Sequence, residues 1–469
     1  DAEPADAALK QDPSQDPLAV WWEMALDEAF DMRVAQGTVT VSADSDYTVK
    51  VDVTDLTRGR DYYYRFFNQG RQSPVGRTRL APEAGADVEQ LRFAVCSCSN
   101  YGFGYFHSYA HMAARPDLDA VLHLGDYFYE YENGNYPSAD QQLRLLEPPT
   151  ETVTLDDYRT RFALYRRDPD LQEAHRQHPF ITIWDDHESA NNAWMGGAEN
   201  HDPETEGSWE ERLAAARQAY FEWLPIRENE GRELYRSFNY GDLADLLMLD
   251  TRIEGREEQF PSLIVPPDST APENIISQAQ EDWLLEQLSS STAKWKIVGN
   301  QVVMSIWNVA GNYANEDAWN GYPVGRRRLL DRIRDAEIEN MVVLTGDVHS
   351  SWAMDVTQDD DSYDPETGSG AIGVEFVAPG ITSPGTPFSG ALIPTSPHIY
   401  YADEENNGYF VLDVREDKVQ ADWYFIEGLE ENQRMEIPGA NWAVLDGTAH
   451  VIEMDGPEPT AEDAPDLAT

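Results

Sequence analysis

Two apolar stretches of this sequence run into short motifs that combine carboxylates with histidine. Residues 341–344 are followed by Asp347 and His349, which alternate along the chain and can point to the same side. Residues 180–184 are followed by Asp185, Asp186, His187 and Glu188. Carboxylates this close repel each other unless a cation or solvent separates them, and histidine with carboxylate suits a transition metal. Taken singly, each motif also has a simpler interpretation, as a surface charge cluster or a structural histidine.

Two further strand-like runs end in side chains that can bind metals. Residues 120–124 stop at Gly125, and Asp126 follows, with Tyr129 on the same side if the chain begins to coil. An Asp in this position is also a common helix N-cap. Residues 91–95 lead into Cys96 and Cys98, although a lone buried cysteine usually behaves as a small hydrophobe. Because ligands gather where the strands of an open α/β sheet end, the four motifs together predict one site.

The elements that must position these motifs alternate between strand-like and helix-like patterns. Apolar strand-like runs occur at 91–95, 120–124, 180–184, 246–249, 295–298, 341–344 and 374–377. Helical stretches are predicted at 209–223, 278–288 and 326–338, and a hairpin at 408–414 and 419–425. This pattern predicts an α/β domain with much buried sheet over residues 88–455.

Two flanking regions differ from this domain. Residues 1–85 contain β-type runs at 47–53 and 62–67, and the spacing of Leu56, Gly59 and Tyr62 is that of a tyrosine corner in fibronectin-like sandwiches. These runs are fewer than the roughly seven strands of a full sandwich, so we expect a small, partial Ig/fibronectin-like β-sandwich with a structural role. Residues 456–469 are rich in Pro, Asp and Glu and are predicted to form a disordered acidic tail.

Composition narrows the class of protein. With 469 residues, 41% of them hydrophobic, the chain can bury one large core and a smaller domain. The net charge of −52 argues against duplex nucleic acid as a partner. It fits either a halophilic protein, whose self-repulsion is screened by salt, or an ordinary acidic secreted protein. Cysteines two residues apart predict no disulfide framework, and no apolar run approaches the ~20 residues of a transmembrane helix.

In combination, the four motifs resemble those of the calcineurin-like metallophosphoesterases, and more specifically the PhoD-type alkaline phosphatases. The resemblance is carried by Ser97-Cys98-Ser99, Gly125-Asp126-Tyr127-Phe128-Tyr129, Trp184-Asp185-Asp186-His187-Glu188 and Gly346-Asp347-Val348-His349. It extends to the β-rich N-terminal region ending at Arg79, and so covers nearly the whole chain. It implies a four-layer αββα metallophosphoesterase domain after the small β-sandwich.

The resemblance also implies the metals and their ligands. Fe3+ would be bound by Cys98, Asp126, Tyr129 and His349, and one or two Ca2+ by Asp126, Asp186 and Asp347. Thiolate, phenolate and imidazole suit ferric iron, whereas an all-oxygen set suits Ca2+, and Asp126 would bridge. Cys98 is preferred to Cys96 because it occupies the Ser-Cys position, and Asp186 to Asp185 because it directly precedes His187.

The implied reaction is the hydrolysis of phosphate esters, in which a hydroxide held between the metals attacks phosphorus in line with the leaving oxygen. His187 would donate a proton to the leaving group or steady the transition state, and it would be oriented by Glu188 or Asp185. Arg252, which follows the run 246–249, is a candidate phosphate clamp, and a structural salt bridge is an equally good interpretation.

The expected substrates are phosphate monoesters and diesters, including phospholipid or nucleotide diesters. A phospholipase D-like phosphodiesterase of the same family is the alternative within the enzyme class. A non-catalytic Ca2+-binding adhesion protein would explain the acidic loops but not Cys98, His187 and His349 together. The resemblance and the acidic composition predict a secreted protein, extracellular or periplasmic, and we expect a monomer.

Overall fold

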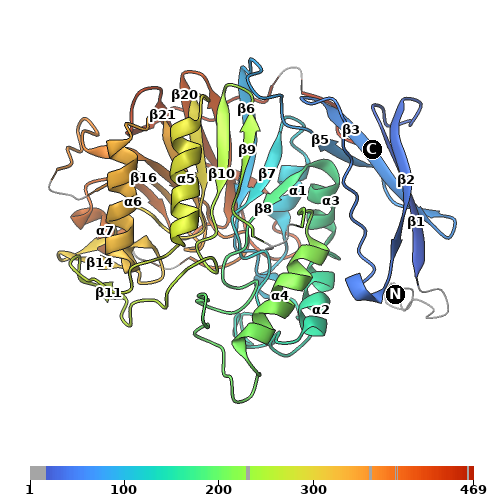
Figure 1. Ribbon diagram of the computed structural model, residues 1–469, viewed down its shortest axis with the longest axis horizontal. Coiled ribbons are helices and arrows are strands. Elements are labelled where there is room, and N and C mark those ends of the chain that lie inside the picture. The colour runs from blue at the N-terminus through green and yellow to red at the C-terminus, as the bar shows by residue number, and fades with distance from the viewer. Residues whose placement is uncertain (1–16, 229–232, 359–361, 386, 388, 462–463) are drawn as a thin grey trace.

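The computed structural model describes residues 17–228, 233–358, 362–385, 387, 389–461 and 464–469 (Figure 1). A large α/β domain contains two seven-stranded sheets, and a small sheet formed by the N-terminal residues lies at one side of it (Figure 1). In the part of the chain that is described, no helix is long and apolar enough to cross a membrane.

The first large sheet has a parallel centre. In pairing order its strands are β18 (Ile399–Asp403), β16 (Ser351–Thr357), β17 (Ala371–Val377), β15 (Met341–Thr345), β12 (Trp295–Gly299), β10 (Ala244–Met248) and β9 (Arg236–Tyr240). Strands β10, β12, β15 and β17 pair in parallel, and β9, β16 and β18 join antiparallel at the two edges. The carboxyl ends of β10 and β15 therefore meet at one edge of this sheet.

The second large sheet mixes a parallel half with an antiparallel one. In pairing order its strands are β22 (Val451–Glu453), β21 (Glu436–Leu445), β20 (Lys418–Ile426), β19 (Gly408–Arg415), β6 (Gln90–Cys96), β7 (Ala120–His123) and β8 (Phe180–Thr182). Strands β6, β7 and β8 pair in parallel, whereas β19 to β22 form an antiparallel meander.

The hydrophobic core is divided by the first sheet into two layers. Leu246 of β10 and Val342 of β15 pack into the same cluster as Val95 of the second sheet. Their chain neighbours Leu247 and Val343 belong to the other cluster, which includes residues of α5 and α6. This division follows from the two-residue period of a strand, which turns alternate side chains to opposite faces.

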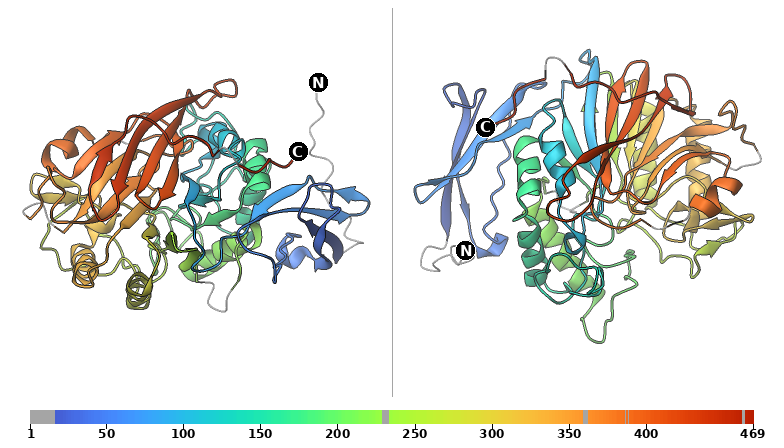
Figure 2. Two further views of the ribbon diagram at one scale, coloured as in Figure 1. Left: turned by 90° about the horizontal axis from the view of Figure 1, so that it is seen from above. Right: turned by 180° about the vertical axis from the view of Figure 1, so that it is seen from behind.

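The helices lie on different sides of the sheets. Helices α5 (Gln278–Ser290) and α6 (Pro323–Asp335) cover the outer face of the first sheet, as Figure 2 shows from above. The helices that pack into the other cluster are α1 (His107–Ala113), α2 (Leu155–Tyr165), α3 (Pro169–Gln177) and α4 (Trp209–Trp223). The result is the mixed α/β domain expected from the sequence, with helices outside and two sheets inside.

Shorter elements complete this domain. A three-stranded sheet consists of β11 (Ile264–Val265), β14 (Asn312–Ala314) and β13 (Asn308–Val309). The short helices are α7 (Ser389–Leu392) and the 3₁₀ turns η4 (Tyr101–Phe103), η5 (Trp319–Gly321) and η6 (Ile393–Thr395).

The N-terminal region forms a β domain of one described sheet. Its strands are β1 (Leu18–Ala25), β2 (Arg33–Val41), β3 (Asp61–Asn68), β4 (Arg71–Gln72) and β5 (Gly76–Arg79), with the 3₁₀ turn η3 (Ala43–Ser45) between β2 and β3. The hydroxyl of buried Tyr62 donates to the carbonyl of Thr57 at 2.8 Å, which is the contact of a tyrosine corner. The run 47–53, expected as a strand, begins in a turn at Tyr47 and lies outside the regular strands, although Val49 packs against the core of this sheet.

The described residues of the C-terminal segment are bound to the rest of the protein. The guanidinium of Arg92 donates to the carbonyls of Glu458 and Pro459, and the side chain of Gln177 exchanges hydrogen bonds of 2.8 and 2.9 Å with the backbone of Ala468. The C-terminal end lies beside the N-terminal sheet (Figure 2). The expected disorder is not seen for these residues, because arginine and glutamine side chains form hydrogen bonds with the backbone of this acidic segment.

Candidate metal centre

The strand-end motifs converge from both large sheets. Cys98, Asp126 and Asp186 follow β6, β7 and β8 of the second sheet, whereas Asp347 and His349 follow β15 of the first. Backbone hydrogen bonds tie the first two loops together, from the Cys98 amide to Gly125 at 3.1 Å and from the Ser99 amide to Asp126 at 2.9 Å. The carboxyl ends of neighbouring parallel strands thus bring distant sequence segments to one place.

Several of these residues have left-handed backbone conformations. The φ angles are 61° for Cys98, 53° for Asp126, 66° for Asp347 and 54° for His349. This region costs a non-glycine residue roughly 1–2 kcal/mol, and such strain concentrates at functional sites. Between the loops, Gly125 has a φ of 111°, and a Cβ there would lie 2.4 Å from the Cβ of Asp185. The motif therefore needs glycine for the close approach of the loops that follow β7 and β8.

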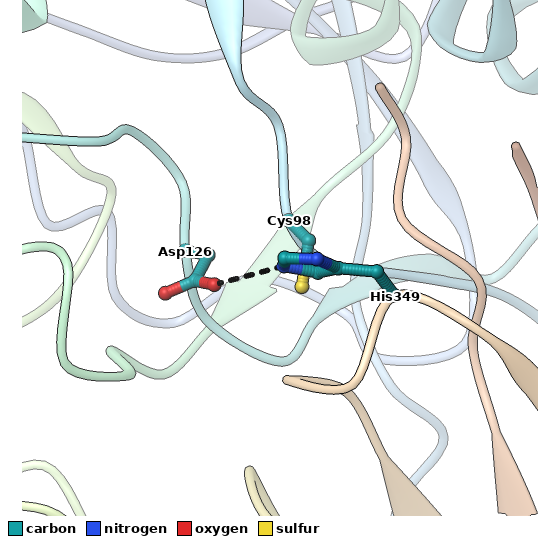
Figure 3. A group of neighbouring side chains, drawn as sticks. All are labelled: Cys98, Asp126 and His349. Carbon is teal, nitrogen blue, oxygen red and sulfur yellow. Dashed lines mark ion pairs between the residues drawn. The ribbon is translucent and has the colours of Figure 1, made fainter. Parts of the chain in front are cut away.

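One group of ligand atoms matches the set expected for iron. Cys98, Asp126 and His349 offer ligand atoms within 4.8 Å of one another, and their side chains point toward a common centre (Figure 3). The Tyr129 hydroxyl donates to Asp126 Oδ2 at 2.9 Å and lies 2.9 Å from His349 Nε2. A sulfur, a phenol, an imidazole and a carboxylate therefore share one ion-sized space.

Two more groups adjoin the first. Asp126, Asp186 and His187 form one, and Asp185, Asp186 and Asp347 form the other, each within the same 4.8 Å limit. Asp126 belongs to two groups, which is the position expected of a bridging ligand. The sequence motif favours Asp186 over Asp185 as a metal ligand, yet both carboxylates lie in the third group.

Burial and mutual repulsion shape the electrostatics of the cluster. Burial, followed by the charge of Asp126, raises the pKa of the Cys98 thiol and of the Tyr129 phenol well above their ordinary values. Burial also raises the pKa of Asp347 to about 7, although Arg252 opposes the shift. For Asp186 burial acts upward, but Arg252 and His187 lower the pKa to about 2. A bound cation would favour the ionised form of every one of these ligands.

The donor set fits metal ions. Within the described ranges, Asp126 Oδ1 and Asp185 Oδ2 are buried and accept no hydrogen bond. Buried carboxylate oxygens are otherwise nearly always satisfied, and a cation would satisfy these two. Thiolate, phenolate and imidazole are ligands for a transition metal such as Fe3+, and carboxylates for a hard ion such as Ca2+.

Arg252 lies inside the acid cluster and is fully buried. Its guanidinium pairs with Asp185, with Asp347 at 2.8 Å, with Asp317 at 2.5 Å and with Asp186 at 3.4 Å. Asp317 is also paired with Arg256. This geometry favours a structural salt bridge over a phosphate clamp. The guanidinium already has acidic partners on several sides and has no exposed surface that a phosphate could contact.

His187 is oriented by a residue that the sequence interpretation missed. Its Nδ1 lies 2.7 Å from Oε2 of Glu130, which is fully buried and also accepts from the Asn191 amide. The expectation of Glu188 or Asp185 in this role is wrong. Glu188 instead accepts backbone N–H groups of the loops after β7 and β8, and Asp185 is taken by Arg252. Because Nδ1 is occupied, Nε2 is the nitrogen left for an ion or a substrate.

Other polar residues of the strand ends have structural contacts. His398 is buried, with Nε2 2.7 Å from the carbonyl of Ile306, and Gln301 accepts from the amide of Thr251. Three residues were not predicted: Glu130, which contacts His187, Asp317, which pairs with Arg252, and Ser383, which contacts Tyr129. Asp317 lies in a loop without a recognisable pattern, whereas Ser383 comes shortly after β17 and could have been found by following every strand to its end.

Comparison with known proteins agrees with this geometry. A sequence profile of PhoD-like phosphatases matches residues 93–423, and one of the PhoD-like phosphatase N-terminal domain matches residues 4–82. The chain is 38% identical to alkaline phosphatase D of Bacillus subtilis (strain 168) in an alignment of 429 residues that covers 87% of this chain and 71% of that protein. A solved structure of PhoD superposes with a TM-score of 0.86 at 34% identity, over 94% of this chain and 86% of that one.

Proposed function

This chain belongs to the PhoD-like phosphatase family and is a hydrolase of phosphoric esters; on this premise we propose that it cleaves phosphomonoesters and phosphodiesters at a centre of Fe3+ and Ca2+. The observation that carries the proposal is the convergence of Cys98, Asp126 and His349 on one ion-sized space, with Tyr129 in contact. Membership of an enzyme family argues against the non-catalytic adhesion protein.

The proposed ligands are divided by chemistry. Cys98, Asp126, Tyr129 and His349 would hold Fe3+, and Asp126, Asp186 and Asp347 would hold Ca2+, with Asp185 as a further oxygen donor. When bound, such cations lower the pKa of water and neutralise charge on a phosphoryl group. A protein of net charge −52 needs a local positive potential to attract an anionic substrate, and the cations would provide it.

The protein's own residues would manage the leaving group and the ligand geometry. His187, held through Nδ1 by Glu130, is the proposed proton donor to the leaving oxygen through Nε2. Arg252 is proposed to fix the carboxylates of Asp185 and Asp347, rather than to contact phosphate. Secretion and a monomeric state are further proposals, supported by the family resemblance and by the acidic composition.

Metal content and the visible spectrum test the centre. We expect the purified protein to contain iron and calcium and to show a tyrosinate-to-iron charge-transfer band, with turnover lost on chelation and restored by Ca2+. Cys98→Ala should remove the band and the activity. Cys96→Ala is the matched control, because Cys96 is equally buried but packs in the hydrophobic core. A colourless, active zinc protein would refute the iron assignment.

Substrate range requires a separate experiment. Rates on p-nitrophenyl phosphate, bis-p-nitrophenyl phosphate and phosphatidylcholine distinguish a monoesterase, a general diesterase and a phospholipase D-like enzyme. We expect hydrolysis of the first two compounds. Preferential release of choline from phosphatidylcholine would favour the phospholipase alternative.

A further inference from the structure

A short segment after β17, residues 382–384, contacts three of the proposed iron ligands. The Ser383 hydroxyl donates to the Tyr129 oxygen at 2.8 Å and lies 3.1 Å from the Cys98 carbonyl. The Pro384 carbonyl lies 3.0 Å from His349 Nδ1. The segment therefore contacts Tyr129 and His349 through their polar side-chain atoms and Cys98 through its backbone.

The contact with Pro384 decides which nitrogen of His349 faces the centre. A carbonyl oxygen can only accept, so Nδ1 carries a proton, and in the neutral imidazole the lone pair is then on Nε2. Nε2 is the atom that lies 2.9 Å from the Tyr129 oxygen and 4.0 Å from Asp126 Oδ2. Partners of this kind orient metal-binding histidines in other proteins.

The contact with Ser383 acts on Tyr129 instead. A serine hydroxyl has a single proton, which can go to the Cys98 carbonyl or to the tyrosine oxygen. When Tyr129 is an ionised ligand, the phenolate is the stronger acceptor, because hydrogen bonds to a charged oxygen are roughly twice as strong as neutral ones. Ser383 is fully buried, so water does not compete for this bond.

The segment is held in place from outside the centre. The Asn407 amide donates to the carbonyls of Gly380 and Ser383 at 2.9 and 2.7 Å. The Thr382 hydroxyl donates to the carbonyl of Asn100 at 2.7 Å, and the Ile381 amide to that of Ser97 at 3.0 Å. Together these bonds hold the backbone of the segment in place before any ion binds.

We infer that Ser383 is a positioning residue that orients Tyr129 and, by donating to its ionised oxygen, sets the electron density that the tyrosine gives to the metal. The inference rests on the proposed function, because it takes Tyr129 as a ligand. Withdrawal of density by a hydrogen bond lowers the energy of the phenolate lone pairs. A phenolate-to-iron charge-transfer band is then at shorter wavelength than without the bond.

The experiment compares Ser383→Ala with Thr382→Val in the metal-loaded protein. Ser383→Ala should move the visible band to longer wavelength and weaken metal retention roughly tenfold, as measured by the rate of metal loss to a chelator. Thr382→Val loses a hydrogen bond in the same segment but none to Tyr129. The bonds from Asn407 and from the Ile381 amide still hold the backbone of the segment, so this variant should change neither quantity. Ser383→Thr, which keeps the hydroxyl, should restore the wild-type band.

A second background separates this inference from the proposed function. In Tyr129→Phe, the further change Ser383→Ala should no longer affect metal loss, because its partner is gone. Equal effects of Ser383→Ala in both backgrounds, or a wild-type band and loss rate in Ser383→Ala, would overturn the role of Ser383. If the wild-type protein is active but has no visible band, the iron assignment fails, and the rates of metal loss then decide the role of Ser383 without it.

Discussion

Arg252 has no exposed surface and pairs with carboxylates from two different motifs, Asp185 after β8 and Asp347 after β15. Breaking such a buried pair on one side leaves an uncompensated charge, which costs about 3–5 kcal/mol. Removing the guanidinium would leave several acids facing each other. At the scale of the residue, Arg252 therefore links the loops of the two sheets.

Arg252→Met should lower the free energy of unfolding by about 3–5 kcal/mol, measured by denaturant unfolding in the presence of a chelator. The matched control is Arg334→Met, because Arg334 is half-exposed and pairs with Asp331 and Asp335 on the surface. Such exposed pairs contribute about 0–1 kcal/mol. If Arg252→Met raised KM for phosphate esters and left stability intact, the phosphate-clamp interpretation would be correct instead.

The pH dependence of stability can be tested at His178, which lies just before β8 and whose Nε2 is 3.0 Å from the Met112 carbonyl. Burial, with a smaller effect of Arg77, lowers the pKa of His178 to about 4. As the pH falls below about 6.5, the unfolded chain takes up this proton before the native protein does. The contribution of neutral His178 to the free energy of unfolding is therefore complete above about pH 6.5 and is lost as the pH falls toward 4.

His178→Gln should reduce the loss of stability on acidification. At pH 5 the protonation of His178 alone costs roughly 2 kcal/mol, and glutamine can keep the hydrogen bond to the Met112 carbonyl without titrating. Unfolding free energies at pH 7 and pH 5 measure the difference. A variant that loses as much stability as the wild-type protein over this interval would show that His178 is not one of the acid-sensitive groups.

The proposed ligands were predictable because their types and their places after apolar runs both carry information. The contacts that their supporting residues make were not predictable. Glu130 contacts His187 across 57 positions of sequence, and Ser383 contacts Tyr129 across 254. Nothing in the local pattern of either residue indicates its partner, because the contact depends on how the loops fold over the strand ends.

At the scale of the element, apolar runs predicted the central strands well and the outer elements less well. The runs at 91–95 and 341–344 correspond to β6 and β15, which are buried on both faces. Helix α2 was missed, since it buries Arg161 and Tyr158 beside its apolar residues and so has no clear stripe. The alternation at 47–53 reflects the partial burial of Val49 rather than strand pairing.

Gly125→Ala tests whether the ends of β7 and β8 must approach closely. The added Cβ would lie 2.4 Å from Asp185 Cβ and 2.6 Å from its amide nitrogen, so the loop that carries Asp185 and Asp186 must move. We expect a strong loss of metal content and activity in a folded protein. Gly456→Ala is the control, because its new Cβ would meet nothing within 4 Å. Wild-type metal content in Gly125→Ala would show that the loops tolerate a wider separation.

At the scale of the whole molecule, the dominant property is the net charge of −52. Like charges repel in the compact state, and salt shortens the range of this repulsion from about 10 Å at 0.1 M to about 3 Å at 1 M. Many of the acidic groups are nevertheless paired with arginine, as Glu281 is with Arg328 and Arg332 of α6. The acidic groups that exceed the basic ones are the source of the repulsion, and the response of the protein to salt shows whether it is adapted to high salt.

The melting temperature should therefore rise between about 0.1 M and 1 M NaCl, because screening stabilises the compact state more than the expanded one. Sucrose at matched osmolality is the control, because it is excluded from the protein surface but does not screen the repulsion between charges. A melting temperature independent of NaCl would favour the ordinary acidic secreted protein over the halophilic one.

The C-terminal segment connects parts of the chain that are made at very different times. Thr469 donates from its amide to Glu28 at 2.7 Å, and Arg77 donates to the carbonyl of Asp466. Residues 464–469 follow both domains in the chain, so this contact between the N-terminal sheet and α3 forms only after both domains have been synthesised. The N-terminal domain must therefore remain folded while the α/β domain is synthesised, before residues 464–469 can bind to it.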